Sequence, residues 1–286
     1  MLLSGAMFVA VTAIVRYVGA DLPAAEAAFL RYAIGLVFLL PMLRPILRER
    51  PTARQWQLIA LRGAVHAGAV ALWFFAMARI PLAEVTAMGF LSPVYVTLGA
   101  VFVLGERLAL RRLLAIVAAL IGAVIILRPG LREISDGHLA MLVVAVLFAA
   151  SYLIAKLLTD ALSPEMVVGM MSVGVAIGLA PMAAIAWVTP SLAQVGWMAL
   201  TAAFATAGHY TMTLAFKSAP MAVTQPVTFL QLVWATALGY FVFAEAVDLW
   251  VIAGGSLILG AISFITWREA QLNRRNLTPP PTATKV

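Results

Sequence analysis

The sequence contains no cysteine, and only 11% of its 286 residues are charged. Without cysteine the chain has no disulfide, no thiolate metal site and no cysteine nucleophile. Soluble domains carry about a quarter charged residues, so we expect no sizeable soluble domain. The sequence also lacks a His-Glu-x-x-His pattern, a close pair of aspartates and a Gly-rich loop ending in Lys-Ser or Lys-Thr. It therefore predicts neither an enzyme nor an ATP-driven pump, and it requires no metal or cofactor.

Long apolar stretches are abundant in this chain. Hydrophobic residues make up 64% of it, and its mean hydropathy is +1.02. A membrane-spanning helix needs about 20 mainly apolar residues, and such stretches follow one another here with short joints between them. We therefore expect an all-α membrane protein with ten transmembrane helices. The predicted spans lie near residues 2–20, 24–43, 57–79, 82–104, 108–128, 138–159, 164–188, 192–217, 221–244 and 249–268.

Basic residues indicate the orientation of these helices. The net charge is +7, but Lys and Arg form short clusters between apolar stretches, which is a topology signal and does not predict nucleic-acid binding. With a cytoplasmic N-terminus, most of these residues fall on the cytoplasmic side, whereas the outer connection after the ninth span carries Glu245 and Asp248. We therefore expect a multi-pass protein of a bacterial inner (plasma) membrane, in contact with lipid and with both termini in the cytoplasm.

Two segments of the first half match two segments of the second half. The matching segments are residues 59–110 with 198–249 and residues 1–42 with 141–182. The alignments pair Glu106 with Glu245 and Arg16 with Lys156. Each half holds five spans, and because five is odd, the second half must be inverted relative to the first. Inverted repeats are typical of alternating-access carriers, whose binding site lies near the midplane between the halves.

The repeat defines the expected domain organisation. Residues 1–130 form the first five-helix repeat, residues 136–270 form the inverted second repeat, and residues 271–286 form a disordered cytoplasmic tail. The tail contains Pro279-Pro280-Pro281, a composition that is typical of disorder.

Several aromatic, amide and hydroxyl side chains fall far from the predicted helix ends, and Tyr95 and Trp234 occupy equivalent repeat positions. Rings supply stacking area and a few polar groups fix orientation, so this set predicts a pocket for a planar or amphipathic metabolite. Helix packing or lipid contact is the alternative for each ring. The candidate substrate-binding residues are Trp73, Phe90, Tyr95, Tyr152, Tyr210, Thr228, Gln231 and Trp234.

Four charged or imidazole side chains lie deep inside predicted spans, where burial of a charge costs at least ~3 kcal/mol. They are Arg31, Arg62, His66 and His209. The arginines either line the substrate path, where they could bind a carboxylate or an electron-rich ring, or form structural ion pairs, for Arg31 with Glu26 or Glu84. The histidines are either proton relays for coupled transport or hydrogen-bonded packing groups.

Other features predict bends, helix caps and close packing. Pro93 and Pro226 interrupt two spans and are candidate hinges. Glu106 and Glu245 end their spans and are expected to cap the helices that follow, with a coupling role as the alternative. Small residues in the fifth and tenth spans predict scaffold helices or the surface of a homodimer. These small residues are Gly122, Gly254, Gly255 and Gly260.

Four motifs follow one another in the first half: Pro23 to Arg31, Leu61-Arg62-Gly63, Phe90-Leu91-Ser92-Pro93 and Gly105-Glu106-Arg107-Leu108. With these motifs the chain resembles the drug/metabolite transporter superfamily in its ten-helix EamA branch. Within this branch, Glu26-x-x-Phe29-x-Arg31 and Leu61-Arg62-Gly63 are similar to the group with S-adenosylmethionine and riboflavin carriers. The resemblance implies a central cavity among spans one, three, four, six, eight and nine. The second half departs from the pattern, with Gln231-Leu232 in place of Ser-Pro and Ala244-Glu245-Ala246 in place of Gly-Glu-Arg.

These features together predict a secondary transporter. It moves a small organic metabolite, such as riboflavin, S-adenosylmethionine or an amino acid, across the inner membrane by alternating access. The alternative is an exporter of amino acids or drugs by proton exchange. A channel or an intramembrane enzyme is the rival from another class.

Overall fold

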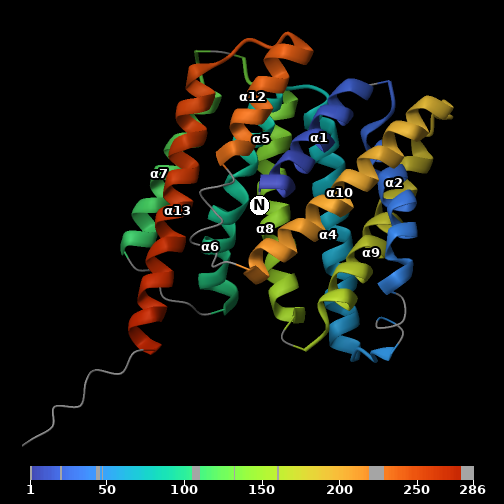
Figure 1. Ribbon diagram of the computed structural model, residues 1–286, viewed down its shortest axis with the longest axis horizontal. Coiled ribbons are helices and arrows are strands. Elements are labelled where there is room, and N and C mark those ends of the chain that lie inside the picture. The colour runs from blue at the N-terminus through green and yellow to red at the C-terminus, as the bar shows by residue number, and fades with distance from the viewer. Residues whose placement is uncertain are drawn as a thin grey trace, which may run out of the picture.

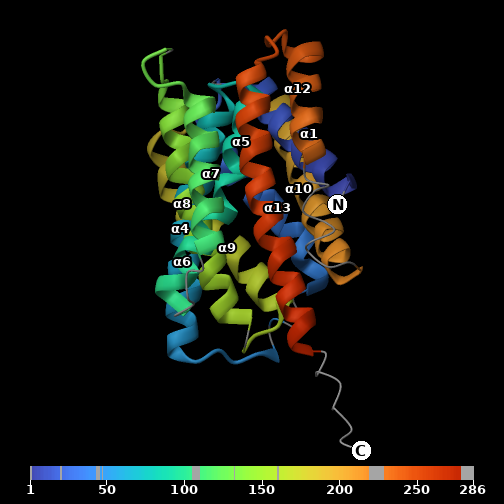
Figure 2. The same cartoon turned by 90° about the vertical axis from the view of Figure 1, so that its left-hand side faces the viewer.

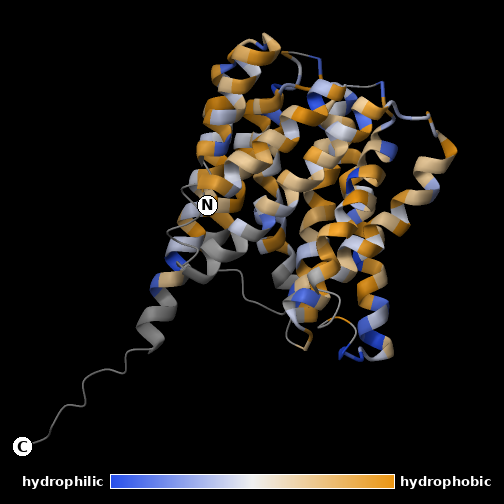
Figure 3. Ribbon diagram, turned by 45° about the vertical axis from the view of Figure 1, so that its right-hand side comes forward, coloured by the Kyte–Doolittle hydropathy of each residue, from blue (hydrophilic) through white to orange (hydrophobic). Residues whose placement is uncertain are grey.

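The computed structural model is a bundle of helices whose connections lie at its two ends (Figure 1). It describes residues 2–19, 21–42, 46, 48–104, 110–131, 133–159, 161–218 and 229–277. Five helices in this part of the chain are long and apolar enough to cross a membrane, and three more are apolar but shorter. Hydrophobic residues dominate the helix ribbons, and hydrophilic ones lie mostly toward the ends of the bundle (Figure 3). The protein is a multi-pass membrane protein.

Each predicted span overlaps one helix or two consecutive ones. The fourth span is divided between two α-helices, and the second ends in a 3-10 helix. In chain order the elements are α1 (Leu2–Val18), α2 (Ala24–Gly35), η1 (Leu36–Met42), α4 (Ala53–Met77), α5 (Leu82–Gly89), α6 (Leu91–Leu104), α7 (Leu110–Leu127), α8 (Asp136–Thr159), α9 (Pro164–Ile185), α10 (Leu192–Ser218), α12 (Phe229–Phe243) and α13 (Leu249–Leu277).

Two helices begin with the same cap, a feature that hydropathy alone does not detect. The N–H of Gln55 donates to the hydroxyl of Thr52, and the N–H of Thr52 donates to the side-chain carbonyl of Gln55. This capping box starts α4 at Ala53, before the predicted boundary at residue 57. Ser191 and Gln194 form the same pair of hydrogen bonds at the start of α10. At the other end of the chain, α13 continues to Leu277, past the predicted end at 268 and into the expected tail.

The fourth span breaks between α5 and α6, at Phe90, one turn before Pro93. Proline has no N–H to donate to the carbonyl four residues earlier, and its ring clashes with that carbonyl. For Pro93 that carbonyl belongs to Gly89, the last residue of α5. The bend that the sequence predicts at Pro93 therefore lies on its N-terminal side. Pro226, the other predicted hinge, lies outside the described residues.

Helices from the two halves of the chain alternate in the bundle. α4 packs against α8 and α9, α1 and α2 pack against α10, and α7 packs against α13 (Figure 2). Glycines allow two of these crossings. A Cβ on Gly63 would lie 2.9 Å from Cα of Gly174, and a Cβ on Gly122 would lie 2.6 Å from the carbonyl oxygen of Gly254. The backbones of α4 and α9, and of α7 and α13, are therefore in direct contact.

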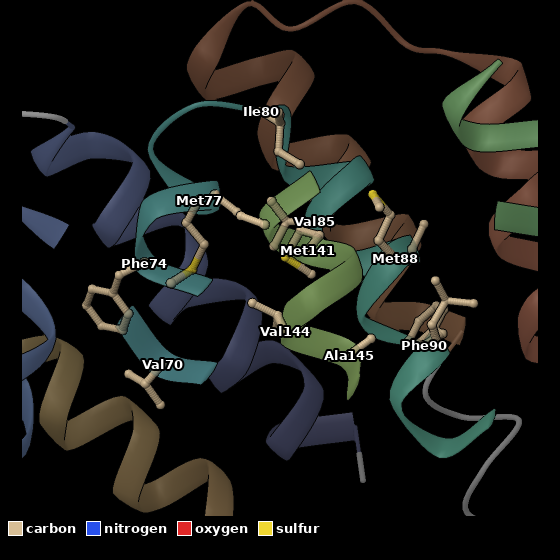
Figure 4. Packing of buried hydrophobic residues seen from close by; sticks show 14 of the residues in the cluster. Val70, Phe74, Met77, Ile80, Val85, Met88, Phe90, Met141, Val144 and Ala145 are labelled. Atoms are coloured by element: carbon tan, nitrogen blue, oxygen red, sulfur yellow. The ribbon is translucent and has the colours of Figure 1, made fainter. Parts of the chain in front are cut away.

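The main hydrophobic core extends through most of the bundle, and Figure 4 shows its part on α4, α5 and α8. Phe74 and Met77 from α4, Val85 and Met88 from α5 and Met141 from α8 all belong to it. These side chains are almost fully buried. The core therefore fixes the relative positions of three helices that also carry the candidate functional residues.

The turn after α12 gives a stability prediction. Ala244 has a φ of 52°, a left-handed conformation that costs a non-glycine residue about 1 kcal/mol. Glycine stands at the aligned position of the first half, Gly105. Ala244→Gly should therefore raise the unfolding midpoint of the purified protein by about 2 °C. Ala246→Gly, where φ is not positive, is the control and should not raise it. An equal or larger gain in the control would contradict the explanation.

Candidate functional site

Four rings from α4 and α8 form one aromatic group. Phe148 stacks on Tyr152, with ring centroids 6.0 Å apart and an interplanar angle of 17°. The edge of Phe148 meets Trp73 at 6.1 Å, and its centroid lies 5.0 Å from that of His66. The structure therefore brings together three predicted site residues, Trp73, Tyr152 and His66. The sequence prediction omitted Phe148, although its four-residue spacing from Tyr152 places both rings on one face of a helix.

Arg62 lies buried between α4 and α9, with 6% of its surface exposed. One terminal nitrogen donates to the carbonyl oxygen of Val167 at 2.8 Å, and the other lies 3.2 Å from the sulfur of Met171. Its Nε has no partner. A buried, incompletely paired guanidinium is costly unless it serves a ligand or a second charge. The Nε–H of Arg62 is therefore a buried hydrogen-bond donor without an acceptor.

Arg31 is buried on α2, and its Cζ lies 4.1 Å from the ring centroid of Tyr32. The two carboxylates considered as its ion-pair partners have other contacts. Glu26 accepts a hydrogen bond from the N–H of Val188 at 2.9 Å, and Glu84 contacts the imidazole of His138. The described contacts therefore favour a cation–π interaction for Arg31.

The two predicted histidines lie within reach of both arginine charges. Arg31 and Arg62 act electrostatically on His66 and on His209. Nδ1 of His66 is 2.9 Å from the buried hydroxyl of Ser151, and the ring of His209 meets Phe8 edge-on at 5.0 Å. Side chains from α2, α4, α8 and α10 therefore lie within electrostatic range of one another in a cationic, ring-rich region. We call it the central cluster: Arg31, Arg62, His66, Phe148, Tyr152 and His209.

Two members of the central cluster are accessible. Tyr152 is 46% exposed, and His209 is exposed as well. The charges of Arg62 and the ring of Tyr152 also act on each other. The central cluster therefore combines buried cations with open aromatic surface.

The other predicted binding residues lie in different surroundings. Gln231 and Trp234 pack against α1, where a Cβ on Gly5 would lie 2.9 Å from Cγ of Gln231. Phe90 is buried in the main core and Tyr95 packs against it. Thr228 and the side chain of Tyr210 lie outside the described part of the chain.

A cavity of about 220 Å³ lies between α1, α2, α4 and α10. Ligand pockets usually measure about 300–1,000 Å³, so this cavity is small for a metabolite. It contains none of the predicted binding residues. Its lining includes Val15, Leu22, Phe74, Phe75, Arg79 and Met198.

Glu245 joins three segments at the end of the bundle where α4 meets α5 and α12 meets α13. Its Oε1 lies 3.2 Å from Nε of Arg16 on α1, and its Oε2 accepts a hydrogen bond from the N–H of Leu82, the first residue of α5. A Cβ on Gly239 would lie 2.5 Å from Oε2, so only glycine leaves room for the carboxylate. Burial raises the pKa of Glu245, and the Leu82 N–H and the Arg16 charge act in the opposite direction.

This geometry corrects the predicted capping role of Glu245. The carboxylate does cap a helix, but the helix is α5 and not the following helix, α13. Asp248 takes that place and accepts a hydrogen bond from the N–H of Trp250 at 2.9 Å. A single sequence cannot reveal that Leu82 lies beside Glu245. Glu106, the aligned residue of the first half, lies outside the described residues.

Comparison with known proteins decides the family. The model of the EamA-like transporter family matches residues 1–128 and 135–267. The chain belongs to this family. The match confirms the resemblance carried by the motifs, and the protein is a transporter and not an enzyme.

This EamA-like transporter matches its curated relatives over most of the length of both chains. A riboflavin transporter from Rhizobium johnstonii is 31% identical over 96% of this chain and 92% of its own. An S-adenosylmethionine uptake transporter from Rickettsia prowazekii is 25% identical over 89% of this chain and 86% of its own. A crystal structure with 20% identity has a TM-score of 0.60 and covers 95% of this chain and 97% of its own, which supports the fold.

Removing the Glu245 carboxylate from this EamA-like transporter should loosen the end of the bundle that it joins. Glu245→Ala leaves the first N–H of α5 uncapped and Arg16 unpaired, at a cost of about 2 kcal/mol. We expect a lower unfolding midpoint in detergent, measured by tryptophan fluorescence. Gly239→Ala should reproduce part of this loss, because its methyl group would occupy the position of the carboxylate.

Glu133→Ala is the matched control, because Glu133 is exposed. Its unfolding midpoint should stay within the small range of surface substitutions. An unchanged midpoint in Glu245→Ala would show that the three contacts do not stabilise the bundle.

Proposed function

We propose that this EamA-like transporter is a secondary carrier that moves a small planar metabolite of the riboflavin type across a bacterial inner membrane by alternating access. The central cluster carries this proposal, because it offers aromatic rings and guanidinium groups on helices of both halves. Rings that stack on a flat ligand contribute about 0.5–1.5 kcal/mol each beyond the area that they bury.

The charges of the central cluster favour a neutral or electron-rich substrate. The charged groups that act on His66 include Arg31 and Arg62. A guanidinium can stack on an electron-rich ring or donate to its carbonyl oxygens. S-adenosylmethionine carries a carboxylate that a guanidinium can bind, but its sulfonium and ammonium leave it with a net positive charge, which this cationic region repels. An isoalloxazine ring has the flat surface and the carbonyl oxygens that the cluster fits.

The curated relatives agree with this choice of substrate. The Rhizobium johnstonii protein named as a riboflavin transporter is more similar to this chain, at 31% identity, than the Rickettsia prowazekii S-adenosylmethionine uptake transporter, at 25%. Both names describe small metabolites that contain a planar ring system. The relatives therefore support the metabolite class, and the cationic cluster supports the flavin within it.

The helix contacts support two inverted five-helix repeats, residues 1–130 and 136–270, with both termini in the cytoplasm. In the other half of the chain, α4 packs against α8 and α9, and α10, its counterpart in the second half, packs against α1 and α2. An inverted repeat requires these two sets to correspond. The capping boxes at the starts of α4 and α10 lie at aligned positions, which is a second, local sign of the same repeat.

The ion pair between Arg16 and Glu245 fits a closed outer end in the alternating-access cycle. It joins α1 of the first repeat to the α12–α13 connection of the second, and in the proposed topology it faces the periplasm. Opening this end requires the pair to separate. Both partners have like-charged counterparts in the aligned sequence, Lys156 and Glu106.

Counterflow in liposomes tests the function. Purified protein is reconstituted into vesicles loaded with unlabelled riboflavin, and entry of labelled riboflavin is followed over time. A carrier gives saturable uptake that the internal substrate accelerates, whereas a channel gives neither saturation nor acceleration. S-adenosylmethionine and amino acids serve as competitors and should inhibit weakly. Counterflow of labelled S-adenosylmethionine in vesicles that show no counterflow of riboflavin would overturn the choice of substrate.

The aromatic group gives a variant test. Trp73→Ala and Tyr152→Ala should each raise the KM for riboflavin by roughly 3–10-fold, the equivalent of one lost stacking contact. Membrane expression should not change. Phe241→Ala is the control, because this ring is exposed on α12 and outside the central cluster, and its KM should equal that of the wild type. Wild-type KM values in both cluster variants would rule out the aromatic group as the binding surface.

A further inference from the structure

The cavity between α1, α2, α4 and α10 lies at the end of the bundle where α1 meets α2 and α4 meets α5. Its volume is about 220 Å³, whereas protein interiors contain few voids larger than a water molecule. An apolar cavity of about 150 Å³ is enough to bind benzene. The cavity therefore has room for a single aromatic ring.

The internal repeat shows that this space belongs to one end of the bundle. Four residues that line the cavity have aligned partners in the other half, and these partners form one packed cluster of buried side chains at the opposite end of α4. The lining residues and their partners are Val18 and Leu158, Leu22 and Leu162, Ala27 and Val167, and Met198 and Ile59.

The difference between the two ends lies partly in side-chain size. Val18 is smaller than Leu158, and Ala27 is smaller than Val167. Equivalent helices therefore pack closely at one end and leave a cavity at the other. The repeated architecture alone does not require this cavity, because the aligned residues fill the corresponding space with their own side chains.

The lining combines aromatic surface with one positive charge. Phe74 and Phe75 lie on α4, and Arg79 is the charged residue among those that line the cavity. The Arg79 guanidinium lies 3.5 Å from the centroid of the Phe75 ring, and one terminal nitrogen donates to the carbonyl oxygen of Phe75 at 3.1 Å. Arg79 is exposed, so the charge marks the mouth of the cavity.

Arg79 has donors left for an anion. A guanidinium carries five N–H donors, and the ion pairs found among the described residues do not include Arg79. Asp21, in the connection between α1 and α2, is exposed and does not line the cavity. An anion at the mouth of the cavity therefore meets a cation that no described carboxylate neutralises.

These groups together fit an amphipathic anion with one ring. The ring of such a ligand would fill the cavity and contact the phenylalanine rings. Its carboxylate would accept charge-assisted hydrogen bonds from Arg79. A neutral aromatic molecule would use the cavity alone, and a simple anion would use Arg79 alone. A ligand that carries both groups therefore gains most.

We propose that this cavity is a second binding site, which takes a small aromatic carboxylate, and that the bound ligand inhibits transport. The walls come from α1, α2 and α4 of the first half and from α10 of the second. Alternating access requires the two halves to move against each other. A ligand that binds only this arrangement stabilises it and slows the cycle. The inhibition rests on the proposed carrier function, whereas the binding does not.

Equilibrium dialysis of purified protein against labelled phenylacetate tests the binding. We expect saturable binding to one site per chain. Phenylacetamide has the same ring without the charge, and acetate has the charge without the ring. Each should bind at least about ten-fold more weakly than phenylacetate, which corresponds to the loss of one of the two contacts. Absence of saturable binding, or equal binding of phenylacetamide, would overturn the site.

Two variants test the residues that form the site. The double substitution Val18→Leu with Ala27→Val gives the cavity the side chains of the packed cluster, which fit together at the other end. It should lose phenylacetate binding and keep an unfolding midpoint no lower than that of the wild type. Arg79→Gln should weaken phenylacetate binding about ten-fold and leave phenylacetamide binding unchanged.

Arg54→Gln is the matched control, because Arg54 is also an exposed arginine of α4 but lies at its other end. It should bind phenylacetate as the wild type does. Wild-type affinity in a folded double variant would show that phenylacetate binds elsewhere, and an equal loss in Arg54→Gln and Arg79→Gln would remove Arg79 from the site.

Riboflavin counterflow in liposomes tests the inhibition. External phenylacetate should lower the maximal rate and leave the KM unchanged, because the cavity and the central cluster are separate. The double variant should transport at the wild-type rate and ignore phenylacetate. A raised KM at an unchanged maximal rate would place phenylacetate in the central cluster and overturn the proposal, and so would normal counterflow with the site occupied. If no substrate shows counterflow, the carrier function fails, and dialysis still decides on the binding site.

Discussion

The contacts of the Glu245 carboxylate organise one end of this bundle. A charge cannot remain alone in an apolar environment, and this one is compensated by Arg16 on α1 and by the first N–H of α5. Three segments from both halves of the chain therefore meet at one residue. The position of α5 fixes Glu84, and through Glu84 it fixes the start of α8. A single carboxylate thus helps to set the geometry in which Glu84 and His138 meet.

The buried charges are divided between two regions of opposite character. The central cluster is rich in guanidinium groups and rings, whereas the interface of α5 and α8 holds a carboxylate and an imidazole. The first region therefore has the chemistry of the proposed substrate site, whereas the carboxylate and the imidazole of the second satisfy each other.

Hydropathy predicts the spans well, because a lipid bilayer imposes a common length on every helix. Local hydrogen bonding and proline set the helix boundaries that hydropathy does not predict. Thr52 and Gln55 start α4 early, and the missing N–H of Pro93 breaks the fourth span at Phe90. Contacts between distant residues are harder to foresee. Leu82 lies 163 positions from Glu245 and Glu84 lies 54 from His138, so one sequence without relatives gives no sign of either pair. The rings of Trp73 and Tyr152 were predicted because they lie deep in their spans, but the same reasoning included Phe90, which packs in the core.

The crossing at Gly63 and Gly174 has a mechanical consequence. Where two helices touch backbone to backbone, no rotamer has to change when one turns against the other. Resistance to rotation at such a point is small compared with that of interlocked side chains, so the crossing acts as a fulcrum. Arg62, next to Gly63, spans this contact through its hydrogen bond to Val167. A small rotation about the fulcrum displaces a guanidinium close to the axis very little and the distant helix ends much more. Such a rotation would change the shape of the bundle at its ends while its central charges kept their positions.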